Sequence, residues 1–336
     1  MNPLLRARWA ALAALPLILS AAEPALDPNF TILRQVTDTG SYGIAVRIVD
    51  QHLQRYPDDP RLHALRARLE QLIAESKDDP ARLPPRLGGP APIPGHEPVA
   101  GAGFTVATAG IAMLWVAPGE FLMADPVGSD DDTEVVLTRG YWLGRTEVTQ
   151  EQWRAVMENL PSPSFFKGSD RPVENIAWNI AMEFCRKVND RERAAGRLPP
   201  GYEYTLPTEA QWEYACRAGT TGPHAGNLPE MAWYEPNGGN QTHPVAQKKP
   251  NAWGFYDMHG NVWEWCLDGY NGYPGGRVAD PMNGYEGPSA AMARILRGGS
   301  FGSTAGQLYS GARYRSVLSF TGPGTGLRLA LTPVRK

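Results

Sequence analysis

The stretch of sequence that decides the fold is Gly254-Phe-Tyr-Asp-Met-His-Gly-Asn-Val-Trp-Glu-Trp265. Gly260 can form a tight turn because glycine adopts backbone angles that other residues avoid. In a strand that follows the turn, successive side chains point to opposite faces. Trp263 and Trp265 would then share one face, where their large rings can fill a core. The stretch therefore predicts a tight turn that leads into a core strand.

Four further stretches accompany this one. Two precede it and two follow it: Tyr141-Trp-Leu-Gly-Arg-Thr-Glu-Val-Thr149, Leu206-Pro-Thr-Glu-Ala-Gln-Trp-Glu-Tyr-Ala215, Arg297-Gly-Gly-Ser300 and Gly326-Leu-Arg-Leu-Ala330. Together the five stretches resemble the formylglycine-generating enzyme, or sulfatase-modifying factor, family over roughly residues 104–336. The resemblance implies an α+β, loop-rich sulfatase-modifying-factor fold related to C-type lectins. The composition agrees, because 36 glycines, 31 prolines and 10 tryptophans indicate many turns and large aromatic anchors.

Local signals within this region predict three helices. Thr149 and Thr208 are each followed three residues later by a glutamine, which is the capping-box pattern of a helix start. A further helix is expected from about residue 179, where apolar residues recur at helical spacing, to the glycine at 196. The remainder is expected to form short strands and turns.

The copper-binding cysteine pair of the family is missing from this chain. The resemblance implies that in active members one cysteine closely follows the Arg-Gly-Gly-Ser stretch, with a second five residues beyond, and that the pair binds copper and oxidises a substrate cysteine to formylglycine. Ser303 and, approximately, Leu308 stand at these positions here, and no cysteine follows Cys266. Soft thiolates select Cu(I), and a hydroxyl and an isobutyl group cannot replace them. We therefore expect no copper, no catalytic residue and no formylglycine generation.

The resemblance also implies one calcium ion within residues 254–265. Its ligands would be the carbonyl oxygens of Asp257, Gly260 and Val262 and the carboxylate of Glu264. Calcium takes six to eight hard oxygen ligands, and a loop that turns into a strand can aim carbonyls and one carboxylate at a single point. The alternative is that Glu264 forms a salt bridge with an arginine while the neighbouring tryptophans fill the core.

The chain has three cysteines, Cys185, Cys216 and Cys266. Each lies among apolar neighbours, which is typical of small buried core residues. An odd number permits at most one internal disulfide, and the pairing stays open.

The chain before the main domain predicts three segments. Residues 1–22 combine two arginines, an apolar run and small residues, which is typical of a secretory signal peptide. Residues 23–78 contain two apolar stripes at helical spacing and predict a helical hairpin, and residues 79–103 are rich in proline and glycine and predict a linker. Residues 104–336 then form the formylglycine-generating-enzyme-like domain. We expect a periplasmic mature chain without a membrane span, because the apolar run is shorter than the roughly 20 residues that a spanning helix needs.

The charge balance argues against nucleic acid as a partner. The chain has 32 basic and 35 acidic residues, a net charge of −3 and no long basic run, whereas nucleic-acid binding needs a phosphate-neutralising surface.

Two functions remain. The first is a non-catalytic periplasmic regulatory protein. A resemblance to accessory proteins of type VI secretion implies that it activates a membrane-spanning Ser/Thr kinase, PpkA, through the periplasmic region of that kinase, in the threonine-phosphorylation pathway that promotes secretion. Another envelope protein would be the alternative partner. The second function is a divergent metal-dependent oxidase or biosynthetic enzyme of the same superfamily. The missing cysteine pair favours the first.

Overall fold

The chain divides into two compact units, residues 1–86 and 87–336. The structure, a computed structural model, describes residues 98–123, 133–158, 162–282 and 293–334, together with individual positions between residues 49 and 71.

In the first unit, described positions such as Val49 and Leu62 are helical and buried. The hairpin predicted over residues 23–78 stays a prediction. The segment predicted as a signal peptide and most of the predicted linker lie outside the described residues. Among the helices of the described residues, none has the length and apolar content needed to cross a membrane.

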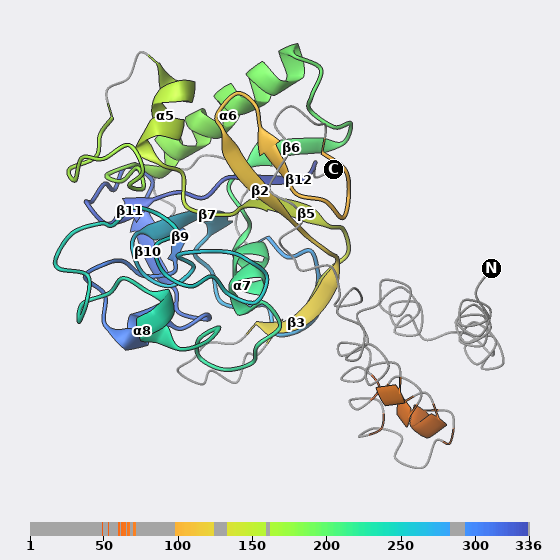
Figure 1. The fold of residues 1–336 in the computed structure, drawn as a ribbon. Helices are drawn as coiled ribbons and strands as arrows, with labels where there is room; N and C mark the ends of the chain where they lie inside the picture. The colour runs from red at the N-terminus through yellow and green to blue at the C-terminus, as the bar shows by residue number, and fades with distance from the viewer. Residues whose placement is uncertain are drawn as a thin grey trace, which may run out of the picture. The chain divides into compact units, whose positions relative to one another are not determined.

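A five-stranded antiparallel sheet runs through the second unit (Figure 1). Its strand order is β1-β2-β5-β12-β6, so that β12, from the C-terminal end of the chain, lies between β5 and β6. The five strands are β1 (Phe104–Val106), β2 (Ile111–Val116), β5 (Tyr141–Gly144), β12 (Ala330–Pro333) and β6 (Tyr202–Thr205).

This sheet is buried on both faces. Successive side chains of a strand point to opposite faces, and neighbours in β2, β5 and β12 accordingly enter two different hydrophobic clusters. In β2, Met113 joins one cluster and Leu114 the other. In β12, Ala330 and Leu331 divide in the same way. The sheet therefore separates two cores within one domain.

Two smaller sheets complete the β structure. One has the order β10-β9-β7-β11 and the other the order β3-β4-β8. Their strands are β10 (Tyr314–Val317), β9 (Ala293–Arg297), β7 (Trp263–Gly269), β11 (Thr325–Gly326), β3 (Gly119–Met123), β4 (Thr133–Leu137) and β8 (Gly276–Ala279). The turn at Gly260, with φ of 86°, leads into β7, so the predicted turn and core strand are confirmed.

Within the described part of the second unit, three helices start where the sequence predicts, and a short fourth was not predicted. They are α5 (Gln150–Met157), α6 (Trp178–Ala194), α7 (Glu209–Arg217) and the short α8 (Leu228–Met231), with a 3-10 turn, η2 (Ala305–Leu308). Thr149 and Thr208 each form the predicted capping box at the start of α5 and α7. α5 and α6 lie together at one end of the domain, away from α8 (Figure 1). The predicted α+β, loop-rich fold is confirmed.

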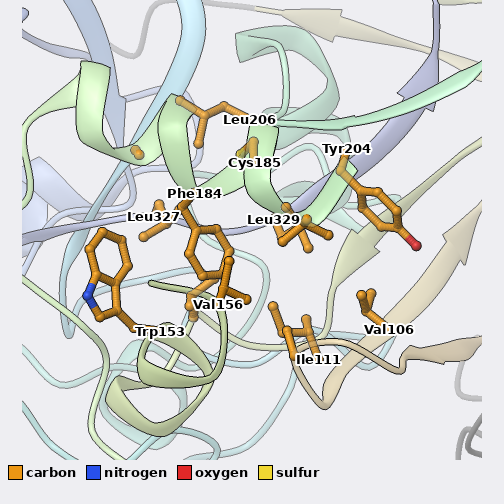
Figure 2. Close-up of a cluster of buried hydrophobic side chains, with 14 of the residues drawn as sticks. Val106, Ile111, Trp153, Val156, Phe184, Cys185, Tyr204, Leu206, Leu327 and Leu329 are labelled. Atoms are coloured by element: carbon orange, nitrogen blue, oxygen red, sulfur yellow. The ribbon is translucent and has the colours of Figure 1, made fainter. Parts of the chain in front are cut away.

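The larger core joins α5 and α6 to the sheet (Figure 2). The rings of Trp153 from α5 and Phe184 from α6 stack with centroids 5.4 Å apart. Leu327 and Leu329, which precede β12, point into the same cluster. Packing of this kind fixes the position of the segment that carries Arg328 between those two leucines.

Candidate functional site

Glu264 of β7 lies at the centre of a buried polar network. Its carboxylate accepts hydrogen bonds from Nε and Nη2 of Arg328, at 2.6–3.1 Å, and from Nε1 of Trp212, at 2.6 Å. Glu264, Trp212 and Arg328 are all inaccessible to solvent. Arg328 also donates to the carbonyl oxygens of Gly144 and Tyr256. The stretch that decides the fold is thus tied directly to the stretches of Trp212 and Arg328, and Arg328 in turn ties it to the stretch of Gly144.

The remaining stretch joins the network through Arg297. This residue pairs with Glu264 across β9 and β7, and its guanidinium forms a buried ion pair with Glu213 of α7. It also donates to the carbonyl oxygen of Ala312 at 2.6 Å. Because Glu213 belongs to the same stretch as Trp212, all five stretches meet in one buried hydrogen-bonded group. This arrangement explains physically why they occur together.

Two further carboxyl groups lie beside Glu264. Glu147 accepts hydrogen bonds from Asn261 Nδ2 and from the N–H of Val262, at 2.7 and 3.0 Å. Burial, together with the nearby carboxylates of Asp257 and Glu264, raises the pKa of Glu147 well above its ordinary value. Burial raises the pKa of Asp257 to about 6. Three buried carboxyls therefore lie around the guanidinium of Arg328, and the raised pKa values of Glu147 and Asp257 show that their ionised forms are disfavoured in the absence of a further cation.

The four predicted calcium ligands all belong to the stretch that contains Glu264. Asp257, Gly260, Val262 and Glu264 lie on one continuous turn and strand, as predicted. Asp257 Oδ1 is buried and has no hydrogen-bond partner among the described residues, so an oxygen ligand is at hand. Glu264 forms a salt bridge with Arg328, which is the alternative to calcium binding for this residue. A carboxylate has about four acceptor positions, and the contacts from Arg328 and Trp212 already use both oxygens of Glu264, so an ion would have to displace part of this arrangement. The oxygen ligands are of the type that calcium takes, and the ion itself stays a prediction.

Ser303, at the first degenerate cysteine position, forms part of a tight turn. Its Oγ accepts a hydrogen bond from the N–H of Ser300 at 3.0 Å, and its own N–H donates to the carbonyl oxygen of Ser300 at 2.9 Å. Its carbonyl oxygen accepts from the N–H of Glu235 at 3.0 Å. Ser303 is almost fully buried. Its polar atoms therefore serve the backbone of the turn.

Leu308, at the second position, is a core residue. It ends η2 and has no solvent exposure, and it packs in a small apolar cluster with Leu228, Ala232 and Tyr234. A Cβ added to Gly299 would lie 2.8 Å from Cδ1 of Leu308, and Gly299 has φ of 79°. The close approach and the positive φ both require glycine here. The side chain of Leu308 is therefore held by hydrophobic packing.

A histidine and a cysteine lie behind this cluster. His259 is buried, with Nδ1 2.8 Å from the carbonyl oxygen of Leu308 and with Nε2 accepting from the N–H of Ala225 at 3.1 Å. These bonds indicate that Nδ1 carries the proton. Burial lowers the pKa of His259 to about 4. Cys216 Sγ lies 3.7 Å from His259 Nε2, but burial raises the pKa of this thiol to about 12. A buried thiol of that pKa is a core residue and a poor nucleophile.

The three cysteines are all buried and none is in a disulfide. Burial raises the pKa of Cys185 and Cys266 as well. Among the described residues, no group of three or more His, Cys, Asp or Glu side chains is arranged to hold a metal ion through side chains alone. A calcium ion held largely by carbonyl oxygens would need no such group.

Glu147 and Arg328 are the residues of this network that sequence reasoning did not assign. Both lie inside the stretches that carry the resemblance, so the signal was present. Their pairing with residues 114 and 64 positions away, Asn261 and Glu264, depends on the tertiary fold.

Comparison with family models identifies this domain. Residues 104–333 match the model of the sulfatase-modifying factor enzyme 1-like domain. The matched range includes the network around Glu264 as well as Ser303 and Leu308.

Three relatives illustrate the range of proteins that share this region. The chain is 31% identical over 248 residues to the chaperone protein LppX of Paenibacillus barcinonensis. The aligned region covers 60% of this chain and 83% of that protein. It is 32% identical over 150 residues to the formylglycine-generating enzyme of Streptomyces coelicolor, across 39% of this chain and 42% of the enzyme. It is 29% identical over 249 residues to the serine/threonine-protein kinase pkn1 of Chlamydia caviae, across 65% of this chain and 37% of the kinase. The chain thus spans less than half of the enzyme and of the kinase.

A solved structure supports the same fold. Variable protein 1 of Treponema denticola is 31% identical to this chain, with a TM-score of 0.60, and the likeness covers 69% of this chain and 99% of that structure.

Proposed function

The chain belongs to the family of sulfatase-modifying factor enzyme 1-like domains, and from that premise we propose that it is a non-catalytic binding and regulatory protein. The observation that carries the proposal is the burial of Leu308 within an apolar cluster, beside a turn that uses the polar atoms of Ser303. Neither side chain can hold copper as two thiolates do. The frame around these positions is retained, as expected of a domain used for recognition.

The partner we propose is a Ser/Thr kinase. Support comes from the kinase pkn1, where a region similar to this chain makes up 37% of a protein named as a serine/threonine kinase. In more detail, we propose that the chain acts as the type VI secretion accessory protein TagR does: exported by residues 1–22 to the periplasm, it would activate the membrane-spanning kinase PpkA through the periplasmic region of that kinase. The threonine-phosphorylation pathway that promotes secretion would then be switched on.

A direct binding measurement tests this proposal. The purified chain is titrated by calorimetry against the purified periplasmic region of the kinase, with an unrelated exported domain of similar size as the control. Saturable binding is expected with the kinase region alone. Absence of binding at high micromolar concentration would overturn the proposed partner.

The alternative is a divergent metal-dependent oxidase or biosynthetic enzyme. The 32% identity to a formylglycine-generating enzyme favours this alternative. Metal analysis of the chain purified from its native envelope separates the two, because an oxidase of this kind would carry stoichiometric copper or iron. For the binding protein we expect neither metal, with calcium as the one bound ion.

A further inference from the structure

The strand β10 is an edge of its sheet. Among the described residues it pairs with one strand, β9, in the antiparallel register Tyr314↔Leu296 to Val317↔Ala293. A strand with a neighbour on one side only directs half of its backbone hydrogen-bonding groups away from the sheet. Such an edge can accept a further strand from another chain.

The exposed side chains of β10 are unusual for an edge strand. Soluble proteins usually protect edges with lysine, proline, bulges or inward-pointing charges. β10 contains neither lysine nor proline, and it leaves Tyr314 47% and Val317 49% exposed. Tyr270, which directly follows β7 in the same sheet, is 38% exposed. Two of the large exposed hydrophobic residues of the described chain therefore belong to β10, and a third directly follows a strand of the same sheet.

The charge at this edge is positive. The guanidinium groups of Arg313 and Arg315 lie 4.8 and 4.9 Å from the ring centroid of Tyr270. Arg313 also forms a close ion pair with Glu209, so its charge is already compensated. Arg315 is exposed, and the ion pairs within the described part of the chain do not include it. An aromatic ring attracts a guanidinium but leaves its charge in place. Arg315 thus presents a positive charge on the same face of β10 as the exposed Val317, and it is adjacent along the strand to the exposed Tyr314.

These features distinguish between two possible occupants of the edge. A second copy of the chain could pair β10 with β10, but the two Arg315 side chains would then lie close together, and like charges on paired strands are destabilising. An acidic strand would instead place a carboxylate near Arg315 and apolar side chains near Tyr314 and Val317. Charge complementarity therefore favours a different protein.

We propose that β10 binds an extended, acidic segment of a partner protein, which adds to the four-stranded sheet as a fifth strand. Backbone hydrogen bonds would supply much of the affinity, and the side chains opposite Arg315, Tyr314 and Val317 would supply specificity. This inference rests on the proposed binding function and names the surface through which that function is carried out.

Selection from displayed random peptides on the full chain tests the proposal without knowledge of the partner. Peptides selected on the wild type are expected to carry Asp or Glu opposite Arg315, with one apolar residue next to it and another two positions away on its other side. Arg315→Glu should weaken their binding at least about tenfold and should shift a new selection toward Lys and Arg. Val317→Pro should weaken the same peptides because proline removes a backbone donor. Arg193→Glu, a charge-matched change at an exposed position of α6, should have no effect.

Several results would overturn the inference. The first is that the selected peptides show no bias toward acidic residues. The second is that wild type and Arg315→Glu bind the selected peptides equally well. The third is that the wild-type chain sediments as a dimer and that Val317→Pro abolishes this dimer. Melting curves identify a variant that fails to fold, and Arg315→Glu, at an exposed position, keeps the test valid if Val317→Pro fails.

The kinase region provides a separate arm. If it binds wild type, Arg315→Glu and Val317→Pro equally, the proposed function stands and the β10 site falls. If it does not bind, while the peptides show the charge reversal, the β10 site stands and the kinase partner falls.

Discussion

The guanidinium of Arg328 and the carboxylate of Glu264 meet at 2.6 Å, and neither side chain is exposed to solvent. Removing one member of a buried ion pair leaves the other charged and unpaired, which costs about 3–5 kcal/mol. We predict that Arg328→Met lowers the free energy of unfolding in urea by that amount. Arg186→Met, in the exposed pair with Glu183, should change it by less than about 1 kcal/mol. A loss in Arg328→Met as small as the one expected for Arg186→Met would show that the network around Glu264 is unimportant for stability.

The predicted calcium ion gives a second test at the same residue. A ligand that binds only the folded state stabilises it by about 2.7 kcal/mol at one hundred times its Kd. Millimolar calcium should therefore raise the Tm of the wild type, and a chelator should reverse the rise. Glu264→Gln, which keeps one acceptor oxygen for Arg328, should abolish the gain, whereas Glu134→Gln at a half-exposed surface ion pair should retain it. An identical Tm with calcium and with chelator would remove the calcium proposal.

The buried His259 predicts a loss of stability in acid. Burial lowers its pKa to about 4, so between pH 6.5 and 4 the unfolded chain binds a proton that the folded chain does not. The free energy of unfolding should therefore fall as the pH decreases through this window, by up to about 3 kcal/mol from this residue. The measurement compares urea titrations of wild type and His259→Asn at several pH values. Parallel pH profiles for the two proteins would contradict the prediction.

Glu174 predicts the opposite sign. Burial raises its pKa to about 7, although the N–H groups of Phe166 and Phe165 partly offset the effect. Between pH 4.5 and 7 the folded chain holds a proton that the unfolded chain releases, so stability from this residue is present at low pH and is lost as the pH rises through 7. Glu174→Gln should remove that loss and be more stable than wild type at pH 8 by about 1–3 kcal/mol. The amide oxygen can still accept from Phe166, and a variant less stable than wild type at pH 8 would refute the argument.

The elements that depend on residues close together in the sequence were predicted correctly. The capping boxes at Thr149 and Thr208 depend on residues three positions apart, and both helices begin as predicted. The helix expected over residues 179–196 occupies Trp178–Ala194. The order of the five stretches likewise gave the fold, because the contacts among them require those residue types.

What sequence reasoning could not resolve depends on distant contacts. A carboxylate such as Glu264 suits both a calcium ion and an arginine, and the choice of Arg328 depends on a residue 64 positions away. The exposure of Tyr314 and Val317 is equally non-local, because the same apolar residues would be core residues if another strand covered β10. The assignment of Ser303 and Leu308 to the two cysteine positions stays a prediction, and their roles in a turn and in a core became visible only with their neighbours.

The stability of a Leu308 variant distinguishes a structural role of this residue from a position that still borders an active site. Truncation of a fully buried leucine in a well-packed core costs about 2–5 kcal/mol, whereas a side chain that lines an open site can be shortened at little cost. We predict that Leu308→Ala lowers the free energy of unfolding by that amount, because the cavity would open among Leu228, Ala232 and Tyr234. Leu122→Ala, on the exposed face of β3, is the matched control and should change it by less than about 1 kcal/mol. A neutral Leu308→Ala variant would mean that this position still borders an accessible site, and the non-catalytic interpretation would then lose its main support.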